Sequence, residues 1–178
     1  MRRAGPADVG ILRTCRQVYT EAVEILYSNN TFSVNNLWTL IDFSKAIPGQ
    51  RLAAVTHLQI VWNIQKLPLS SALPPTRGEA KYDNYLWETF WDVVAHGMSG
   101  LVNLRINLKV ATAANCKLEL GWVKPLLQVH GLERCNIRMY FREEDIPYDT
   151  AAVKLFQQKL EDSMCTEKGL LIARSKHP

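Results

Sequence analysis

Three stretches of the chain share one spacing of apolar residues, in which an apolar position is followed by two variable positions and then by apolar residues at every second place. Such alternation is typical of a β-strand with one buried face. The three stretches are residues 55–62, 101–108 and 132–139, and a β-prone run at 30–34 adds a fourth candidate strand. The repeated apolar positions are Val55, Leu58, Ile60 and Trp62, then Leu101, Leu104, Ile106 and Leu108, then Leu132, Cys135, Ile137 and Met139.

Segments with apolar residues at helical spacing separate these strands. They run over 8–28, 37–47, 84–96 and 118–129, and a last helix follows the third strand with Val153, Phe156, Leu160 and Met164 on its buried face. Asp8, Asn36 and Asp149 are the expected N-caps, because their side chains can accept a hydrogen bond from the first helical turn. Pro48 is expected to end the second segment, and Pro125 interrupts the fourth.

Strands that alternate with helices imply parallel pairing through right-handed crossovers. The spacing of the strands resembles that of a leucine-rich repeat, whose strands stack into a curved sheet with the helices outside. Successive strands begin 46 residues (55 to 101) and 31 residues (101 to 132) apart, and no asparagine ladder follows them. We therefore predict an α/β fold: an irregular leucine-rich-repeat-like array of about four mostly parallel strands, with helices packed on one side. A plain layered α/β domain with coincidentally similar strands is the alternative.

The 178 residues and 20.3 kDa are in the range of one domain, so residues 1–178 are expected to form a single α/β domain. Residues 63–82 contain three prolines and are expected to form a long loop insertion, either a functional flap or a linker. A last strand is expected at 170–173, and the tail at 167–178 is expected to be mobile.

Residues 11–34, "ILRTCRQVYTEAVEILYSNNTFSV", resemble the most recognisable segment of a family of filamentous-fungal proteins of unknown function. In that family a CRQxxxEAxxxLY helix leads to an NTF strand. Residues 47–62, "IPGQRLAAVTHLQIVW", resemble the next segment of the family, which has a proline, a QR pair and a strand. The resemblance is good over residues 11–62, about a third of the chain, and extends beyond them only as a pattern.

In that family the helix follows an F-box-like segment with an LPxEIR-type motif, which this sequence lacks. The resemblance implies that an F-box-like helix pair would recruit a ubiquitin-ligase adaptor while the leucine-rich strands hold the substrate. From this we expect either that an upstream piece has been removed or that the protein has lost adaptor binding.

The formal net charge of +4 is mildly basic, and no run of like charges forms a nucleic-acid-binding arm. The four cysteines form no CxxC pair, and no signal peptide precedes them, so we expect reduced thiols in the cytoplasm or nucleus. No stretch of about 18 apolar residues predicts a membrane span.

Residues between the apolar positions of parallel strands point away from the core. An aligned repeat would place them in rows: Gln59, Arg105 and Asn136; Val61, Asn107 and Arg138; Asn63, Lys109 and Tyr140. Such a surface is basic and rich in amides, and its guanidinium groups suit a carboxylate or phosphate. Gln59, Arg105, Asn107, Lys109, Arg138 and Tyr140 are therefore candidate binding residues. The alternative is a solvated face whose charges only maintain solubility.

Trp87 and Trp91 are one helical turn apart beside the insertion, which makes them candidates for lining a ligand pocket, although core packing is the favoured role of the tryptophans. No catalytic residue is identified. His57, His96 and His130 are not linked by spacing, so no metal site and no cofactor is expected. The acidic cluster formed by residues 142–145, "REED", with Asp149 is interpreted as a solvated loop that also caps the last helix, and Cys15 as a core residue.

The leading hypothesis is a non-catalytic interaction module that presents a polar, basic sheet face and the 63–82 insertion to a protein or to a small acidic ligand. The family resemblance implies that this module derives from F-box-type substrate receptors. The alternative is a small cofactor-independent enzyme of fungal specialised metabolism, which would enclose a substrate for cyclisation or isomerisation between Trp87, Trp91, the 63–82 insertion and polar strand residues. Nucleic-acid binding ranks last, because neither a motif nor interleaved basic and aromatic residues support it.

Overall fold

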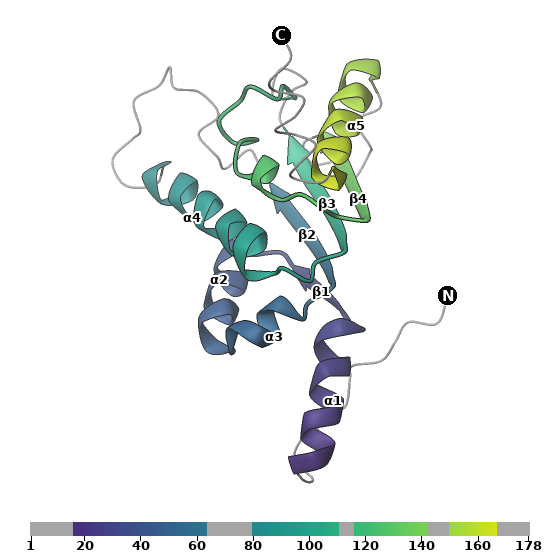
Figure 1. The fold of residues 1–178 in the computed structure, drawn as a ribbon. Coiled ribbons are helices and arrows are strands. Elements are labelled where there is room, and N and C mark those ends of the chain that lie inside the picture. Colours follow the sequence, from purple (N-terminus) through teal and green to yellow (C-terminus); the bar gives the residue numbers. More distant parts are fainter. Residues whose placement is uncertain (1–15, 64–79, 111–115, 142–149, 167–178) are drawn as a thin grey trace, which may run out of the picture.

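The computed structural model describes residues 16–63, 80–110, 116–141 and 150–166. Its centre is a parallel sheet of four strands in the order β1-β2-β3-β4 (Figure 1). Spatial order follows chain order, so each connection moves the chain one strand further in the same direction. The predicted α/β fold and its parallel strands are confirmed. The strands are β1 Thr31–Val34, β2 His57–Asn63, β3 Asn103–Val110 and β4 Arg134–Phe141.

The repeated apolar spacing corresponds to a repeat in three dimensions. Ile60 pairs in register with Ile106, and Ile106 with Ile137, so equivalent positions of the three stretches lie side by side. The apolar residue before each strand is equivalent too, because Val55, Leu101 and Leu132 are all buried. The alignment made from the sequence therefore gives the observed register.

Backbone hydrogen bonds extend this repeat to the turns that precede the strands. The carbonyl group of Thr56 accepts the N–H groups of Val102 and Asn103, each at 3.0 Å. One unit further on, the carbonyl group of Val102 accepts the N–H group of Glu133 at 3.0 Å and that of Arg134 at 3.2 Å. Each unit thus aligns the start of the next strand.

The helices and the apolar side chains of the strands form one core. Leu40 of α2, Phe90 of α4 and Leu160 of α5 are buried with Ile106 of β3 in the same cluster. These three helices therefore cover one face of the sheet, as predicted. The helical segments are α1 Arg16–Ser28, α2 Leu37–Ala46, α3 Gly49–Ala53, α4 Ala80–Asp92, a π-helical turn at Val93–Gly97, a 3-10 turn at Leu126–Gln128, and α5 Ala151–Cys165.

Several predicted boundaries agree with the structure. The side chain of Asn36 accepts the Trp38 N–H group at 3.0 Å and caps α2, and the four residues expected on the buried face of the last helix are all buried. The expected cap Asp149 lies outside the described residues. The cap of α5 is Thr150, whose hydroxyl accepts the Val153 N–H group at 3.4 Å. Residues 8–15, 64–79, 142–149 and 167–178, on which other predictions fall, also lie outside the described part.

The predicted helix at 118–129 is wrong. This segment is a series of turns closed by bonds between residues three apart, such as Val123 N–H to Leu120 O at 3.0 Å and Leu126 N–H to Val123 O at 3.0 Å. Pro125 has no N–H group for an α-helical bond, and its ring crowds the preceding turn, which favours the tighter turns. Pro48 likewise does more than end α2, because it precedes the short helix α3.

The two edges of the sheet differ in the chain that lies beside them. Beyond β4, the Gln157 side chain of α5 donates to the Ile137 carbonyl group at 3.0 Å, and the Glu161 carboxylate accepts the Ile137 N–H group at 2.5 Å. Side chains of a helix thus replace a fifth strand at this edge, where unpaired backbone groups would otherwise be exposed. At the other edge, β1 has no strand beyond it within the described residues.

Candidate functional site

Within the described residues, no helix or strand covers the side of the sheet opposite the helices, and we call the side chains of this side the open face. They alternate along each strand with the buried residues. No Asp or Glu occurs among the side chains of the open face that the structure describes. These are Thr31, Ser33, His57, Gln59, Val61, Asn103, Arg105, Asn107, Lys109, Arg134, Asn136, Arg138 and Tyr140.

The three rows that the sequence predicted are present in the sheet. Gln59 pairs with Arg105, and Arg105 with Asn136, in one row. Asn107 pairs with Arg138 in the next row, and Lys109 pairs with Tyr140 in the one after that. The strand repeat therefore brings the six predicted polar site residues to one face.

Among the described residues, the arginines of the open face lack acidic partners. Arg105, Arg134 and Arg138 are exposed, and none of them forms an ion pair with a residue in the described part of the chain. The ion pairs found there join Lys45 to Asp42 and His96 to Asp92, outside the sheet. The guanidinium groups of the open face are consequently available to an external anion, for which their planar arrangement of donors is well suited.

A further row at the amino ends of the strands was not included in the prediction. Thr31, His57, Asn103 and Arg134 are paired in register across the four strands. These positions lie two residues before the predicted row of Gln59, Arg105 and Asn136, so the alternation of buried and open-face residues could have indicated them from the sequence. From the sequence alone, His57 is considered only as a metal-ligand candidate.

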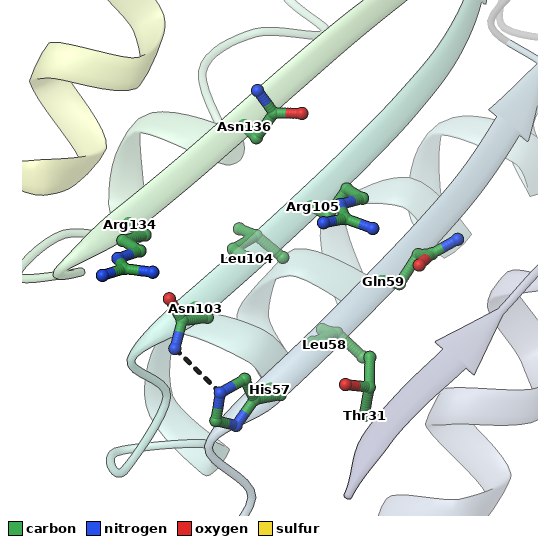
Figure 2. Close-up of a pocket in the computed structure, with 9 residues that line it drawn as sticks. All are labelled: Thr31, His57, Leu58, Gln59, Asn103, Leu104, Arg105, Arg134 and Asn136. Carbon is green, nitrogen blue, oxygen red and sulfur yellow. Dashed lines mark hydrogen bonds between the residues drawn. The ribbon is translucent and has the colours of Figure 1, made fainter. Parts of the chain in front are cut away.

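This row and the next one form an open depression of about 440 Å³ (Figure 2). Its size is within the range of small-ligand sites. Figure 2 shows Arg105 between Gln59 and Asn136, and Arg134 near Asn103 of the neighbouring strand. The lining residues are Thr31, His57, Leu58, Gln59, Asn103, Leu104, Arg105, Arg134 and Asn136.

A chain of hydrogen bonds holds the floor of the depression. The Thr56 hydroxyl donates to the Ser28 carbonyl group, so it accepts the N–H of His57 Nδ1 at 2.7 Å. His57 Nε2 is then the acceptor for the Asn103 amide at 2.9 Å. This set of bonds occupies both ring nitrogens of His57 and holds the Asn103 side chain against β2. His57 is therefore a positioning residue of the depression.

Trp87 and Trp91 do not lie in the depression, and their predicted role in lining a ligand pocket needs correction. The exposed fractions of the two side chains are 1% and 0%. Trp87 packs edge-on against Trp91 at 5.5 Å between ring centroids, and its Nε1 donates to the Trp122 carbonyl group at 2.7 Å. Their large apolar rings are more stable in the core than at the surface. Core packing, the role favoured for the tryptophans, is the observed one.

Ionisable groups with a raised pKa lie near α5 and the connection before β4. Burial raises the pKa of the Glu161 carboxyl group, while the Ile137 N–H bond acts in the opposite direction. Burial raises the pKa of the Cys116 thiol to about 11 and also raises the pKa of the Cys135 thiol. Thiols of this kind remain protonated near neutral pH, so neither cysteine has the properties of an activated nucleophile.

The described residues contain no group of three or more His, Cys, Asp or Glu side chains that could hold a metal ion. His57, His96 and His130 are therefore not brought together in such a group. Of the helices in the described ranges, none has the length and apolar character to cross a bilayer.

The architecture and the open face define an α/β domain in which helices cover one side of a four-stranded parallel sheet and polar side chains form the other side. The chain belongs to the family of the domain of unknown function DUF7730, whose model matches residues 1–159. Searches of curated proteins and of solved structures gave no match.

Proposed function

We propose that this domain is a non-catalytic binding module that holds an anionic partner on the open face of its sheet. The observation that carries the proposal is the charge pattern of this face, which has three arginines without acidic partners in the described part of the chain and no carboxylate among its described side chains. A face that was only solvated would serve equally well with mixed charges, which is the usual condition of a soluble surface. An excess of one sign instead favours association with the opposite charge.

The arrangement of the depression supports binding more than chemistry. Arg105 and Arg134 can donate to an oxyanion, and Gln59, Asn103 and Asn136 add amide donors from three strands. His57 already accepts a hydrogen bond from Asn103 and donates one to Thr56, so both ring nitrogens are occupied by bonds within the protein. An origin in F-box-type substrate receptors, which the sequence resemblance implies, would agree with a face that selects partners.

The enzymatic alternative requires Trp87 and Trp91 to enclose a substrate. Both side chains are in the core, so a substrate could reach them only if packed residues moved apart. The binding hypothesis needs no such change, because Arg105, Arg134 and Arg138 are already exposed.

Charge reversal on the open face tests the proposal. The variant Arg105→Glu with Arg138→Glu changes the formal net charge from +4 to 0 (+4 − 4). Lys124→Glu with Lys159→Glu makes the same change at exposed positions outside the face and is the matched control. Affinity for fluorescently labelled poly-L-glutamate is measured by anisotropy at one ionic strength, with circular dichroism as a check on folding.

We expect the open-face variant to lose about tenfold or more in affinity relative to the control, since each lost charge contact costs roughly a factor of two to five and the reversed charges repel. Equal losses in the two folded variants would show that only net charge matters. That result would refute the assignment of binding to the open face.

A further inference from the structure

The arginines of the open face follow a regular pattern over the β3–β4 pair. Arg134 is on β4, Arg105 is on β3 in the next row, and Arg138 is on β4 in the row after that. Successive rows are two residues apart, which is about 6.6 Å along a parallel strand. The three guanidinium groups therefore emerge at regular steps along a path of about 13 Å.

Each of these arginines has an asparagine as its partner in the same row. Asn103 pairs with Arg134 and Asn136 pairs with Arg105. Asn107 pairs with Arg138 in the same way. One row thus offers a guanidinium fork and an amide, which together provide donors for one carboxylate or phosphate group. The β3–β4 pair repeats this arrangement three times, and the strand to which the arginine belongs changes at every row.

The spacing of these pairs matches a chain in extended conformation. Alternate side chains of a β-strand point to the same side and recur at about 6.6 to 6.8 Å. An acidic residue at every second position would therefore meet one Arg–Asn pair after another. An acidic run without gaps would direct half of its carboxylates away from the sheet.

We propose that the partner of the open face is an extended peptide segment with acidic residues at every second position, which lies along the β3–β4 pair. This inference rests on the proposed function and narrows it to one class of partner. The depression holds the first two Arg–Asn pairs, so it receives two successive acidic side chains of the peptide. The third pair, Asn107 and Arg138, lies one row further along the strands.

A single-stranded nucleic acid is the competing anion, because its phosphates also recur along an extended backbone. Proteins that bind single strands without sequence preference combine a basic groove with aromatic rings on which bases stack. The described open face has Tyr140 in its last row and no Phe or Trp. Its amides and guanidinium groups favour carboxylates of a peptide over stacked bases.

Two isomeric peptides test the inference on the full chain. Both are capped serine peptides with three aspartates, placed at every second position in one and in a single run in the other, so composition and net charge are the same. Binding is followed by NMR through the side-chain Nε–H signals of the arginines in ¹⁵N-labelled protein, which detects weak complexes. A uridine oligonucleotide is titrated under the same conditions at two salt concentrations.

We expect the alternating peptide to bind about three to five times more tightly than its isomer, because it makes at least one more charge-assisted contact. The signals of Arg105, Arg134 and Arg138 should move together with one apparent Kd. In Arg138→Gln, which removes the cation at one end, two adjacent Arg–Asn pairs remain and each peptide can offer an aspartate to both of them, so the two peptides should bind within about a factor of two of each other. Lys124→Gln, outside the face, should leave the preference unchanged.

Equal affinity for the two peptides, with shifts at the three arginines, would overturn the extended-peptide inference and leave the proposed anion-binding function intact. No shift at these arginines with any of the anions would overturn both. Tighter binding of the oligonucleotide, with affinity that falls steeply with salt, would overturn the peptide inference and assign the face to nucleic acid.

Discussion

The two faces of the sheet are built from the same strands, yet they are determined by different requirements. Ile106 is 0% exposed in the core, and its neighbours Arg105 and Asn107 belong to the open face. On the helix side, burial restricts each position to an apolar side chain of suitable size. On the open side, folding uses the hydrogen bonds of His57 and Asn103 but does not require the exposed arginines. The excess of arginine and amide groups there is the basis of the proposed binding function, whereas the residues of the helix side determine stability.

The largest expected effect on the free energy of unfolding comes from alanine substitution of a core residue of β3, compared with alanine substitution of its neighbour on the open face. Ile106→Ala should lower the free energy of unfolding by about 2 to 5 kcal/mol, because it removes buried methyl groups and leaves a cavity. Arg105→Ala, one residue earlier, should change it by no more than about 0.5 kcal/mol. Urea denaturation followed by circular dichroism measures both values. Similar losses in the two variants would mean that the open face is part of the packed interior.

A second test uses the junction that starts β3 on the helix side. A Cβ atom on Gly100 would lie 2.3 Å from the backbone oxygen of Ala53, whereas a Cβ atom on Gly121 would meet no atom within 4 Å. Gly100→Ala should therefore destabilise the fold by about 1 to 3 kcal/mol, as overpacking does. Gly121→Ala serves as the control and should differ from the natural chain by less than about 1 kcal/mol. A stable Gly100→Ala variant would contradict the close approach of these two turns.

Glu161 of α5 binds the backbone at the β4 edge of the sheet. The contribution of Glu161 to stability depends on pH. The folded-state pKa of Glu161 is raised by burial, so the folded protein holds this proton more tightly than the unfolded chain does. Stability from this group is full below the ordinary glutamate pKa and decreases as pH rises through the raised folded value. Glu161→Gln keeps an acceptor for Ile137 without a charge, so it should become more stable relative to the natural chain as pH rises through that range. Thermal melts at a series of pH values test this, and an opposite trend would contradict it.

The smallest expected effect on stability concerns Asn107, which is partly buried although it belongs to the open face. The side-chain oxygen of Asn107 is buried and has no hydrogen-bond partner within the described residues. Its row neighbour Val61 is apolar. Asn107→Val should therefore raise the free energy of unfolding by up to about 1 kcal/mol, since an unsatisfied polar atom is removed. The same change should weaken binding of acidic peptides, which anisotropy can measure. Loss of stability would show that an unassigned bond holds this amide.

The sequence was sufficient for the parts of the fold that depend on apolar spacing. The strands were found because Leu58, Leu104 and the other core positions recur at fixed intervals, and parallel neighbours with equivalent cores align in one register. The same alignment predicted the rows that contain Arg105 and Arg138. A polar face is thus predictable once the opposite face is known.

Other features depended on contacts between distant residues. The prediction of a helix at 118–129 was wrong because the apolar spacing of this segment fits a series of turns as well as a helix, and Pro125 favours the turns. The link from Ser28 through Thr56 and His57 to Asn103 joins three elements, so no local pattern could indicate it. The spacing of Trp87 and Trp91 is common to a pocket and to a core, and only packing distinguishes the two.

Arginine footprinting tests most directly whether the open face, and not the helix side, binds an anionic partner. The folded chain is treated with phenylglyoxal with and without poly-L-glutamate, and modification at each arginine is measured by mass spectrometry. We predict protection of Arg105, Arg134 and Arg138, with no change at the exposed Arg16 of α1 or at Arg51, whose guanidinium lies 4.9 Å from the centroid of the Tyr19 ring. Protection of Arg16 without protection of the three open-face arginines would contradict the account.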